Sequence, residues 1–223
     1  GPDQIIACPN CQALAKYMTL RSGNTFGARL WTDGKRAAPM LPLPPEVVKC
    51  QHCGECYWLE AAAKVGRLGV TSLAVCVYGD RAIDPAWAAA QTVQQPAEEE
   101  YYHAIDQGLA ADTRQERTLR ILAWWRRNDA YRYANKKKSE AEHSVTLSTL
   151  CRANLEALGP LLNEADDDGC LMKAEVLREL GEFESARQVL SLIVSAKYTE
   201  YARQIGVLCD AGDIRVRMLE ISA

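Results

Sequence analysis

Two short stretches near the start of the chain decide how its first part can fold: Cys8-Pro9-Asn10-Cys11 and Cys50-Gln51-His52-Cys53-Gly54. Each holds two cysteines separated by two residues. This spacing lets both sulfurs of a pair reach one metal ion, while backbone N–H groups of the turn donate to the thiolates. Gly54 directly follows the second pair, where such a turn often needs a positive φ. Together the pairs predict one metal site with the ligands Cys8, Cys11, Cys50 and Cys53.

The two motifs resemble the paired cysteine knuckles of a zinc ribbon. The resemblance implies a structural Zn²⁺ held by four thiolates, with no open position for substrate or water. Residues 12–49 make a longer insertion than that family usually has. A hairpin at Asp33-Gly34, followed by a proline-rich extended return, would still bring the pairs together. For so small a β module, we expect the metal to supply much of the folding energy.

Two neighbouring side chains leave the ligand set open. Cys56 would either join or displace the four thiols, or fill a small buried slot beside Tyr57 and Trp58, which we favour. His52 is the less favoured ligand because it lies between two cysteines. The cysteines outside this region fall mostly within apolar patterns, and we expect core packing for them: Cys76, Cys151, Cys170 and Cys209.

The composition is that of an ordinary folded protein, with 223 residues, 48% hydrophobic residues, 25% charged residues and a net charge of −3. These values exclude a disordered tail, a collagen-like fibre and a highly basic nucleic-acid arm. The odd number of cysteines, nine, argues against the disulfide framework of a secreted domain and predicts a reducing, cytoplasmic setting. The chain lacks a run of about 18 apolar residues, so we expect no membrane contact.

The pattern along the chain predicts an α+β protein, mostly α, in three parts. Residues 1–66 are rich in turn formers and predict a small β zinc-ribbon module that ends in a helix from about Tyr57 to Gly66. Residues 67–96 predict a connecting segment with a short helix near 86–91, in which Val70–Tyr78 reads equally as strand or helix. Residues 97–223 predict an α-helical domain.

Helix signals recur through this last part. Three carboxylates at 98–100 favour a helix over about 97–107, and the apolar spacing predicts further helices over about 113–133 and 139–158. The run Asp166-Asp167-Asp168-Gly169 predicts an acidic helix start rather than a calcium loop, because the alternating ligand pattern is missing. Two final helices are expected over 198–211 and 214–221.

One stretch carries a second resemblance: a helix that ends in Leu180-Gly181, then an acidic residue, Phe183 and, three residues on, Ala186. It resembles the turn of a tetratricopeptide-type helical hairpin, over about 171–194. Gly181 can take the left-handed conformation at the helix end, and Phe183 and Ala186 let the next helix pack closely. The resemblance implies a helical-hairpin (TPR-like) domain whose concave surface binds a protein.

Residues 114–138 interleave cations with aromatics: nine basic side chains meet only Glu116 and Asp129. Such a stretch can hold phosphates and stack bases. The candidate residues are Arg126, Arg127, Arg132, Lys136, Lys137 and Lys138. The alternative is an amphipathic helix whose aromatics face the bundle beneath a cover of arginine side chains, and we favour it.

No catalytic set is recognisable, because the three histidines accompany no known nucleophile motif and no phosphate-binding loop occurs. The sequence therefore predicts a non-enzymatic, zinc-stabilised scaffold or adaptor that binds a protein partner. The alternative function is nucleic-acid binding through residues 114–138. Residues 22–42 are either an interaction surface of the metal module or only the hairpin that orders it.

Overall fold

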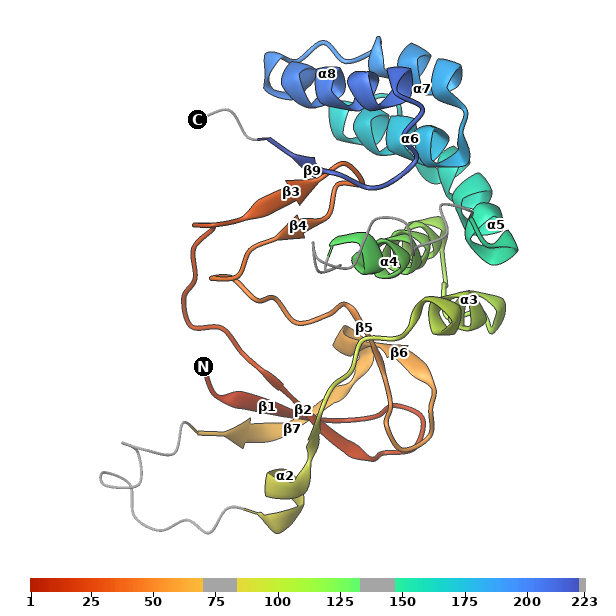
Figure 1. Cartoon of the computed structure of the whole chain (residues 1–223). Coiled ribbons are helices and arrows are strands. Elements are labelled where there is room, and N and C mark those ends of the chain that lie inside the picture. The colour runs from red at the N-terminus through yellow and green to blue at the C-terminus, as the bar shows by residue number, and fades with distance from the viewer. Residues whose placement is uncertain (70–83, 133–146, 221–223) are drawn as a thin grey trace. The chain divides into compact units, whose positions relative to one another are not determined.

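The computed structural model describes residues 1–69, 84–132 and 147–220 of the chain. The chain forms two compact units, and each is built from two separate stretches of sequence (Figure 1). Unit 1 contains Gly1–Gly27 and Ala38–Leu109, and unit 2 contains Ala28–Ala37 and Ala110–Ala223. A short N-terminal segment thus belongs to the C-terminal unit. The predicted strand or helix at Val70–Tyr78 lies outside the described residues.

Unit 1 consists of short strands, a 3-10 turn and two short helices. Its elements are β1 (Asp3–Ala7), β2 (Leu14–Met18), β5 (Val47–Lys49), β6 (Cys56–Trp58), η1 (Leu59–Ala61), β7 (Ala63–Leu68), α2 (Pro85–Ala89), β8 (Gln91–Thr92) and α3 (Glu98–Asp106). One sheet has the order β7-β1-β2-β8, and β5 pairs with β6 in a second. β1 and β2 are antiparallel, as are β5 and β6, and each hairpin carries one cysteine pair in its connection.

The predicted helix from Tyr57 to Gly66 is wrong. This stretch forms β6, η1 and β7 instead. Val47 pairs with Trp58, and Ile5 pairs with Gly66, so both ends are taken up by strands from elsewhere in the sequence. A Cβ atom on Gly66 would lie 2.0 Å from a ring carbon of Trp87, which shows how closely α2 covers β7. Strand pairing and this close contact outweigh the local helix signal.

Unit 2 is largely helical. Its helices are α4 (Thr113–Arg132), α5 (Thr149–Leu158), η2 (Gly159–Leu161), α6 (Asp167–Leu180), α7 (Phe183–Leu190) and α8 (Ala196–Asp210). The predicted acidic helix start is confirmed, since the Asp166 carboxylate accepts a bond from the Gly169 N–H at 2.7 Å. Gly181 ends α6 at φ 85°, and Ala186 on α7 is fully buried, as the turn motif predicts. None of the described helices is long and apolar enough to cross a membrane.

The Asp33-Gly34 hairpin is confirmed, but it belongs to unit 2. β3 (Arg29–Trp31) pairs with β4 (Arg36–Ala37) on one side and with β9 (Met218–Leu219) on the other. The predicted helix over 214–221 is therefore wrong, because the described part of this segment is extended and includes β9. Thr32 donates its N–H to the Arg217 carbonyl at 2.8 Å, and the buried Arg178 donates to the Arg215 carbonyl at 2.8 Å. These bonds occupy groups that a helix would have used.

The predicted division at residues 66 and 97 also needs correction. α3 lies in unit 1 rather than in the helical part. The Lys49 ammonium pairs with the Glu100 carboxylate, and the Trp58 indole N–H donates to the Leu109 carbonyl at 3.0 Å. The chain therefore changes unit at residues 27–28, 37–38 and 109–110.

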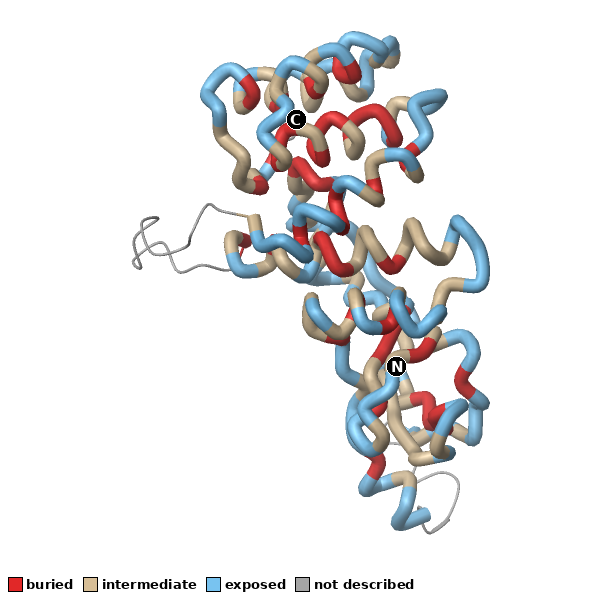
Figure 2. Tube along the Cα trace, turned by 90° about the vertical axis from the view of Figure 1, so that its right-hand side faces the viewer, coloured by how far each residue is buried: buried red, intermediate tan, exposed pale blue. Residues whose placement is uncertain are grey.

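Each unit has its own buried residues, coloured red along the backbone tube in Figure 2. In unit 1, Ile6, Val48, Tyr57 and Ala62 cluster around the cysteines Cys8 and Cys50. Unit 2 has two clusters, one around α4, α5 and α6 and the other around α6, α7 and α8. Trp124, Leu155 and Ile205 are fully buried there.

Candidate metal centre

Both cysteine pairs lie in turns with the same backbone pattern. The Cys8 carbonyl accepts from the Gln12 N–H at 2.9 Å, and the Cys50 carbonyl accepts from the Gly54 N–H at 2.9 Å. In each turn the first cysteine also donates its own N–H five residues ahead, to Ala13 and Glu55 respectively, both at 2.9 Å. The two knuckles are therefore built alike, although their sequences share little beyond the cysteines.

The closing residue of each knuckle has a left-handed conformation. Gly54 has φ 82°, as the sequence predicts, and Gln12 has φ 61°. Gln12 is the one non-glycine residue with positive φ among the described ranges. Such a conformation costs a residue with a Cβ roughly 1 kcal/mol, so the fold of the first knuckle must hold Gln12 in place. The sequence did not indicate this position because glutamine is not a residue typical of left-handed turn positions.

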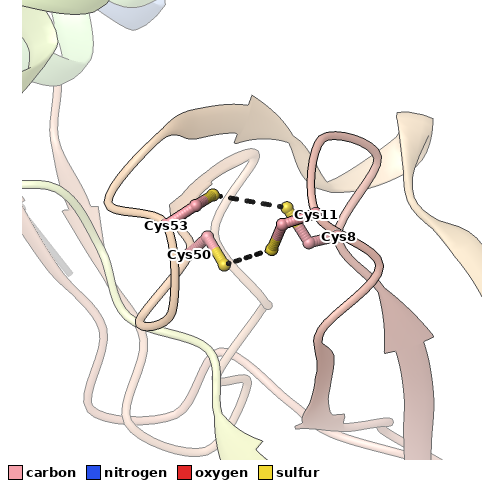
Figure 3. Close-up of side chains that lie close together, drawn as sticks. All are labelled: Cys8, Cys11, Cys50 and Cys53. Atoms are coloured by element: carbon pink, nitrogen blue, oxygen red, sulfur yellow. Dashed lines mark hydrogen bonds between the residues drawn. The ribbon is translucent and has the colours of Figure 1, made fainter.

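The four sulfurs converge on one point (Figure 3). All four Sγ atoms of Cys8, Cys11, Cys50 and Cys53 lie within 4.8 Å of one another. The Sγ atoms of Cys8 and Cys53 are 3.9 Å apart, and those of Cys11 and Cys50 are 3.6 Å apart. A tetrahedral ion with metal–sulfur bonds of about 2.3 Å places its sulfurs about 3.8 Å apart. The cysteines are free thiols, far outside the bond length of a disulfide. This arrangement can hold one metal ion.

The protein environment shifts the pKa values of these thiols in different directions. Desolvation is the main influence on Cys8 and raises the pKa of its thiol to about 12. The Glu55 backbone N–H is the main influence on Cys53 and lowers the pKa of that thiol to about 7. Two further donors face the sulfurs: the His52 backbone N–H lies 3.4 Å from Cys50 Sγ, and Asn10 Nδ2 lies 3.7 Å from Cys53 Sγ. A cation would favour four thiolates at neutral pH, because metal binding drives proton release from its ligands.

Cys56 and His52 are not members of the sulfur cluster in the described residues. The Cys56 thiol is half-buried at the start of β6 and lies 3.9 Å from the Glu100 carbonyl, to which it donates. Desolvation raises the pKa of Cys56 to about 11, which favours the protonated thiol at neutral pH. The His52 side chain is exposed. The structure therefore leaves Cys56 outside the cluster of four cysteines, although it is half-buried rather than enclosed in a buried slot.

Apolar side chains support the centre from beneath. Ile6, Val48 and Tyr57 are buried against the candidate ligands Cys8 and Cys50. Desolvation, followed by the neighbouring cysteines, raises the pKa of Tyr57 to about 12. The surrounding residues thus exclude water from one side of the sulfurs, while Cys11 and Cys53 remain partly accessible.

The basic-aromatic stretch is bound largely into unit 2. The Arg132 side chain is fully buried, pairs with the Asp33 carboxylate and lies 2.8 Å from that of Asp129, so it cannot contact a phosphate in this fold. The Trp124 indole is also fully buried and donates to Glu179 at 2.9 Å. The Trp125 indole donates to the Asp33 carbonyl at 2.9 Å.

The other candidate cations are placed differently. The Arg126 side chain is 42% exposed and lies 3.7 Å from the Asp129 carboxylate. Arg127 is partly buried. Lys136, Lys137 and Lys138 lie outside the described residues. The prediction of Arg132 as a candidate nucleic-acid-binding residue is therefore wrong. Its partner Asp33 is 99 residues away in sequence, so the residues neighbouring Arg132 in the helix could not indicate this ion pair.

Comparisons with protein-family models, with curated proteins and with solved structures found no match for this chain. Its function is therefore inferred from its own residues and their geometry.

Proposed function

We propose that this chain is a zinc-stabilised, non-enzymatic scaffold that binds a protein partner. The observation that carries the metal part is the convergence of Cys8, Cys11, Cys50 and Cys53, whose sulfurs lie within 4.8 Å of one another. The repeated knuckle geometry supports the zinc-ribbon interpretation, because the backbone of each turn brings two sulfurs to the same side.

Zinc is the metal that this donor set favours. Four thiolates in tetrahedral array bind Zn²⁺ or iron, and soft sulfur ligands disfavour Mg²⁺ and Ca²⁺. The sulfur separations of 3.6 and 3.9 Å suit one ion at the centre. An iron–sulfur cluster would spread the same four cysteines around several metal atoms.

A four-thiolate site leaves no coordination position for substrate or water, which supports a structural role. The ion would join the β1–β2 and β5–β6 connections, which are far apart in sequence. Its binding energy would then be folding energy for unit 1. The same reasoning supports a non-enzymatic role for this site.

The binding part of the proposal rests on the helices of unit 2. The α6–α7 turn has the features of a TPR-like hairpin: the Gly181 N–H donates to Arg178 and the Glu182 N–H donates to Leu177, at 3.0 and 2.8 Å. Ala186 is fully buried in the apolar cluster around α6, α7 and α8, and Phe183 is partly buried against this cluster. Stacked hairpins of this kind present extended surfaces that suit protein partners.

Three measurements on purified protein test the proposal. Metal analysis should find one zinc per chain, and a strong chelator should lower the melting temperature or remove the unit 1 transition. Substitution of cobalt for zinc should give the absorption of four thiolate ligands. A protein that is metal-free yet fully ordered would refute the zinc assignment, and catalytic turnover at the metal would refute the structural role.

Affinity capture with the full chain tests the scaffold role. A reproducible protein partner whose binding survives nuclease treatment supports it. Recovery of nucleic acid alone would instead support the alternative function. In that case the affinity for nucleic acid should fall steeply as the salt concentration rises. It should also fall when Arg126→Ala and Arg127→Ala are combined.

A further inference from the structure

A cleft of about 690 Å³ lies beside the metal centre in unit 1. It is lined by one side of each cysteine knuckle and by the C-terminal half of α3. The lining residues are Pro9, Asn10, Gly54, Glu55, Cys56, Tyr57, Glu100, His103, Ala104, Gln107, Gly108 and Leu109. All of them belong to the same unit, and the volume is typical of ligand-binding clefts.

The charge lining this cleft has one sign. Glu55 and Glu100 contribute carboxylates, and none of the lining residues is lysine or arginine. Lys49 already pairs with Glu100, whereas the Glu55 side chain is exposed. Glu55 is therefore the carboxylate that an incoming cation would meet.

Two other features add negative potential. α3 is nine residues long, and His103 and Ala104 in its last turn border the cleft together with the Gln107–Leu109 turn that follows it. Helix C-termini carry partial negative charge on their last carbonyls. The adjoining knuckles would hold four thiolates around one divalent ion, which leaves a net negative charge at the cleft's edge.

The remaining lining mixes the polar side chains of Asn10, His103 and Gln107 with an apolar part that suits the stem of a long side chain. Tyr57 and Ala104 are buried, and Pro9 and Leu109 complete the apolar part. Lysine and arginine lay their methylene stems along such surfaces while the charged head stays near water. A small inorganic cation would not use this surface, and a phosphate would be repelled by the charge.

We propose that the cleft beside the metal centre binds a lysine or arginine side chain of a basic segment in a partner protein. This proposal rests on the proposed function, because the thiolate–metal centre supplies part of the negative charge. It places the partner-binding site on unit 1, in addition to any surface that the helices of unit 2 offer.

The test uses the zinc-loaded full chain and a blocked pentapeptide, glycine-arginine-alanine-arginine-glycine, followed by NMR and calorimetry. The matched probe replaces both arginines with neutral citrulline. Backbone amide shifts should concentrate at residues 54–57 and 103–109, and the citrulline peptide should cause none. Glu55→Gln should weaken binding by about twofold to fivefold, the upper part of the range for one exposed ion pair.

Two further variants make the outcome specific. Gln107→Lys places a cation in the cleft and should weaken binding at least as much as Glu55→Gln. Glu99→Gln removes an exposed carboxylate of the same helix that does not line the cleft, so the affinity should not change.

The outcomes separate this proposal from the zinc assignment. Full zinc content without peptide-dependent shifts at the cleft overturns the proposal and leaves the zinc assignment intact. Equal binding of the citrulline peptide, shifts confined to other surfaces, or a free polyamine that binds as tightly as the peptide also overturns it. Ordered protein without zinc refutes the proposed function directly, whatever the peptide does.

Discussion

The two units of this chain are stabilised in different ways. Unit 1 has short strands and a small apolar cluster that includes two of its four clustered cysteines, Cys8 and Cys50. Unit 2 has two helical clusters and a buried polar network that joins Asp33, Asn128 and Glu179. Small domains with little core usually depend on a metal or on disulfides, whereas a helical core can be stable without them. Because the two units are stabilised differently, we expect one perturbation to destabilise one unit and leave the other folded.

The largest expected effect is the loss of one metal ligand. Cys50→Ser should abolish zinc binding and unfold unit 1, because the apparent binding free energy of structural zinc, about 10–16 kcal/mol, is comparable to the stability of a whole domain. Metal analysis and NMR should show loss of unit 1 signals while the helices of unit 2 remain. Cys56→Ser is the matched control and should keep the zinc. An ordered unit 1 in Cys50→Ser would contradict the comparison.

The buried ion pair gives the next largest effect, and it should be confined to unit 2. Asp33→Ala leaves the Arg132 guanidinium buried without its main partner, and the side chains of both residues are fully buried. The free energy of unfolding of unit 2 should fall by about 3–5 kcal/mol, measured by urea denaturation.

Two variants show whether this loss comes from the stranded charge. Asp33→Ala combined with Arg132→Met should recover part of the stability, because no buried cation remains. Arg126→Ala, which removes an exposed arginine of the same helix, should change stability by about 0.5 kcal/mol or less. A loss of similar size in Arg126→Ala would argue against the buried pair as the cause.

The pH dependence of stability should have opposite signs in the two units. Desolvation is the main influence on Glu179 and raises the pKa of its carboxyl group to about 7, and the charge of Glu175 raises this pKa further. The hydrogen bonds from Trp124 and Asn128 and the charge of Arg178 lower it in part. Between pH 4.3, the ordinary pKa of glutamate, and about 7, the native state keeps a proton that the unfolded state has lost. The free energy of unfolding of unit 2 should therefore fall by roughly 3–4 kcal/mol as the pH rises through this window.

Unit 1 should behave in the reverse way, because protons compete with the metal for the thiolates and stability is lost as the pH falls. Denaturation followed by NMR at pH 5, 6 and 7.5 separates the two responses. Glu179→Gln lowers stability at every pH, since an amide cannot accept both donors, but it should flatten the pH dependence of unit 2. An unchanged slope in this variant would assign the effect to another group.

The smallest effect compares the two knuckles with each other. Gly54→Ala should destabilise the zinc-loaded protein by about 1 kcal/mol, because it puts a Cβ on a residue with φ 82°. Gln12→Gly removes a Cβ at φ 61° and should stabilise the first knuckle by up to about 1 kcal/mol. Thermal melts of the two variants measure the difference. Equal changes in the same direction would mean that the knuckles are not equivalent.

Features with a local physical cause could be predicted from the sequence. The two-residue spacing of the cysteines, the turn at Asp33-Gly34, the acidic helix start at Asp166 and the left-handed Gly181 each depend on a few adjacent residues. All of these predictions agree with the structure. The clustering of the four thiols also followed from spacing, although residues 12–49 separate the two pairs.

Predictions failed where the partner of a segment lies far away in the chain. Gly66 pairs with Ile5, and Leu219 pairs with Leu30, so two stretches that were predicted as helix include strands instead. Arg132 is a candidate in the less favoured nucleic-acid interpretation because its stretch interleaves cations with aromatics, but its partner Asp33 is 99 residues away. Arg132 is buried because the hairpin that carries Asp33 packs into unit 2, and no local sequence pattern indicates this packing.

Residue chemistry at short range was thus enough to identify the four cysteines that cluster and to locate most of the helices. Tertiary contacts decided which unit each of two segments joins: the 28–37 hairpin belongs to unit 2 and α3 to unit 1. They also decided that Asp33 is buried with Arg132. The physical reason is that turn geometry and helix starts depend on neighbours along the backbone. Strand pairing and buried ion pairs depend instead on which distant segments exclude water from one another.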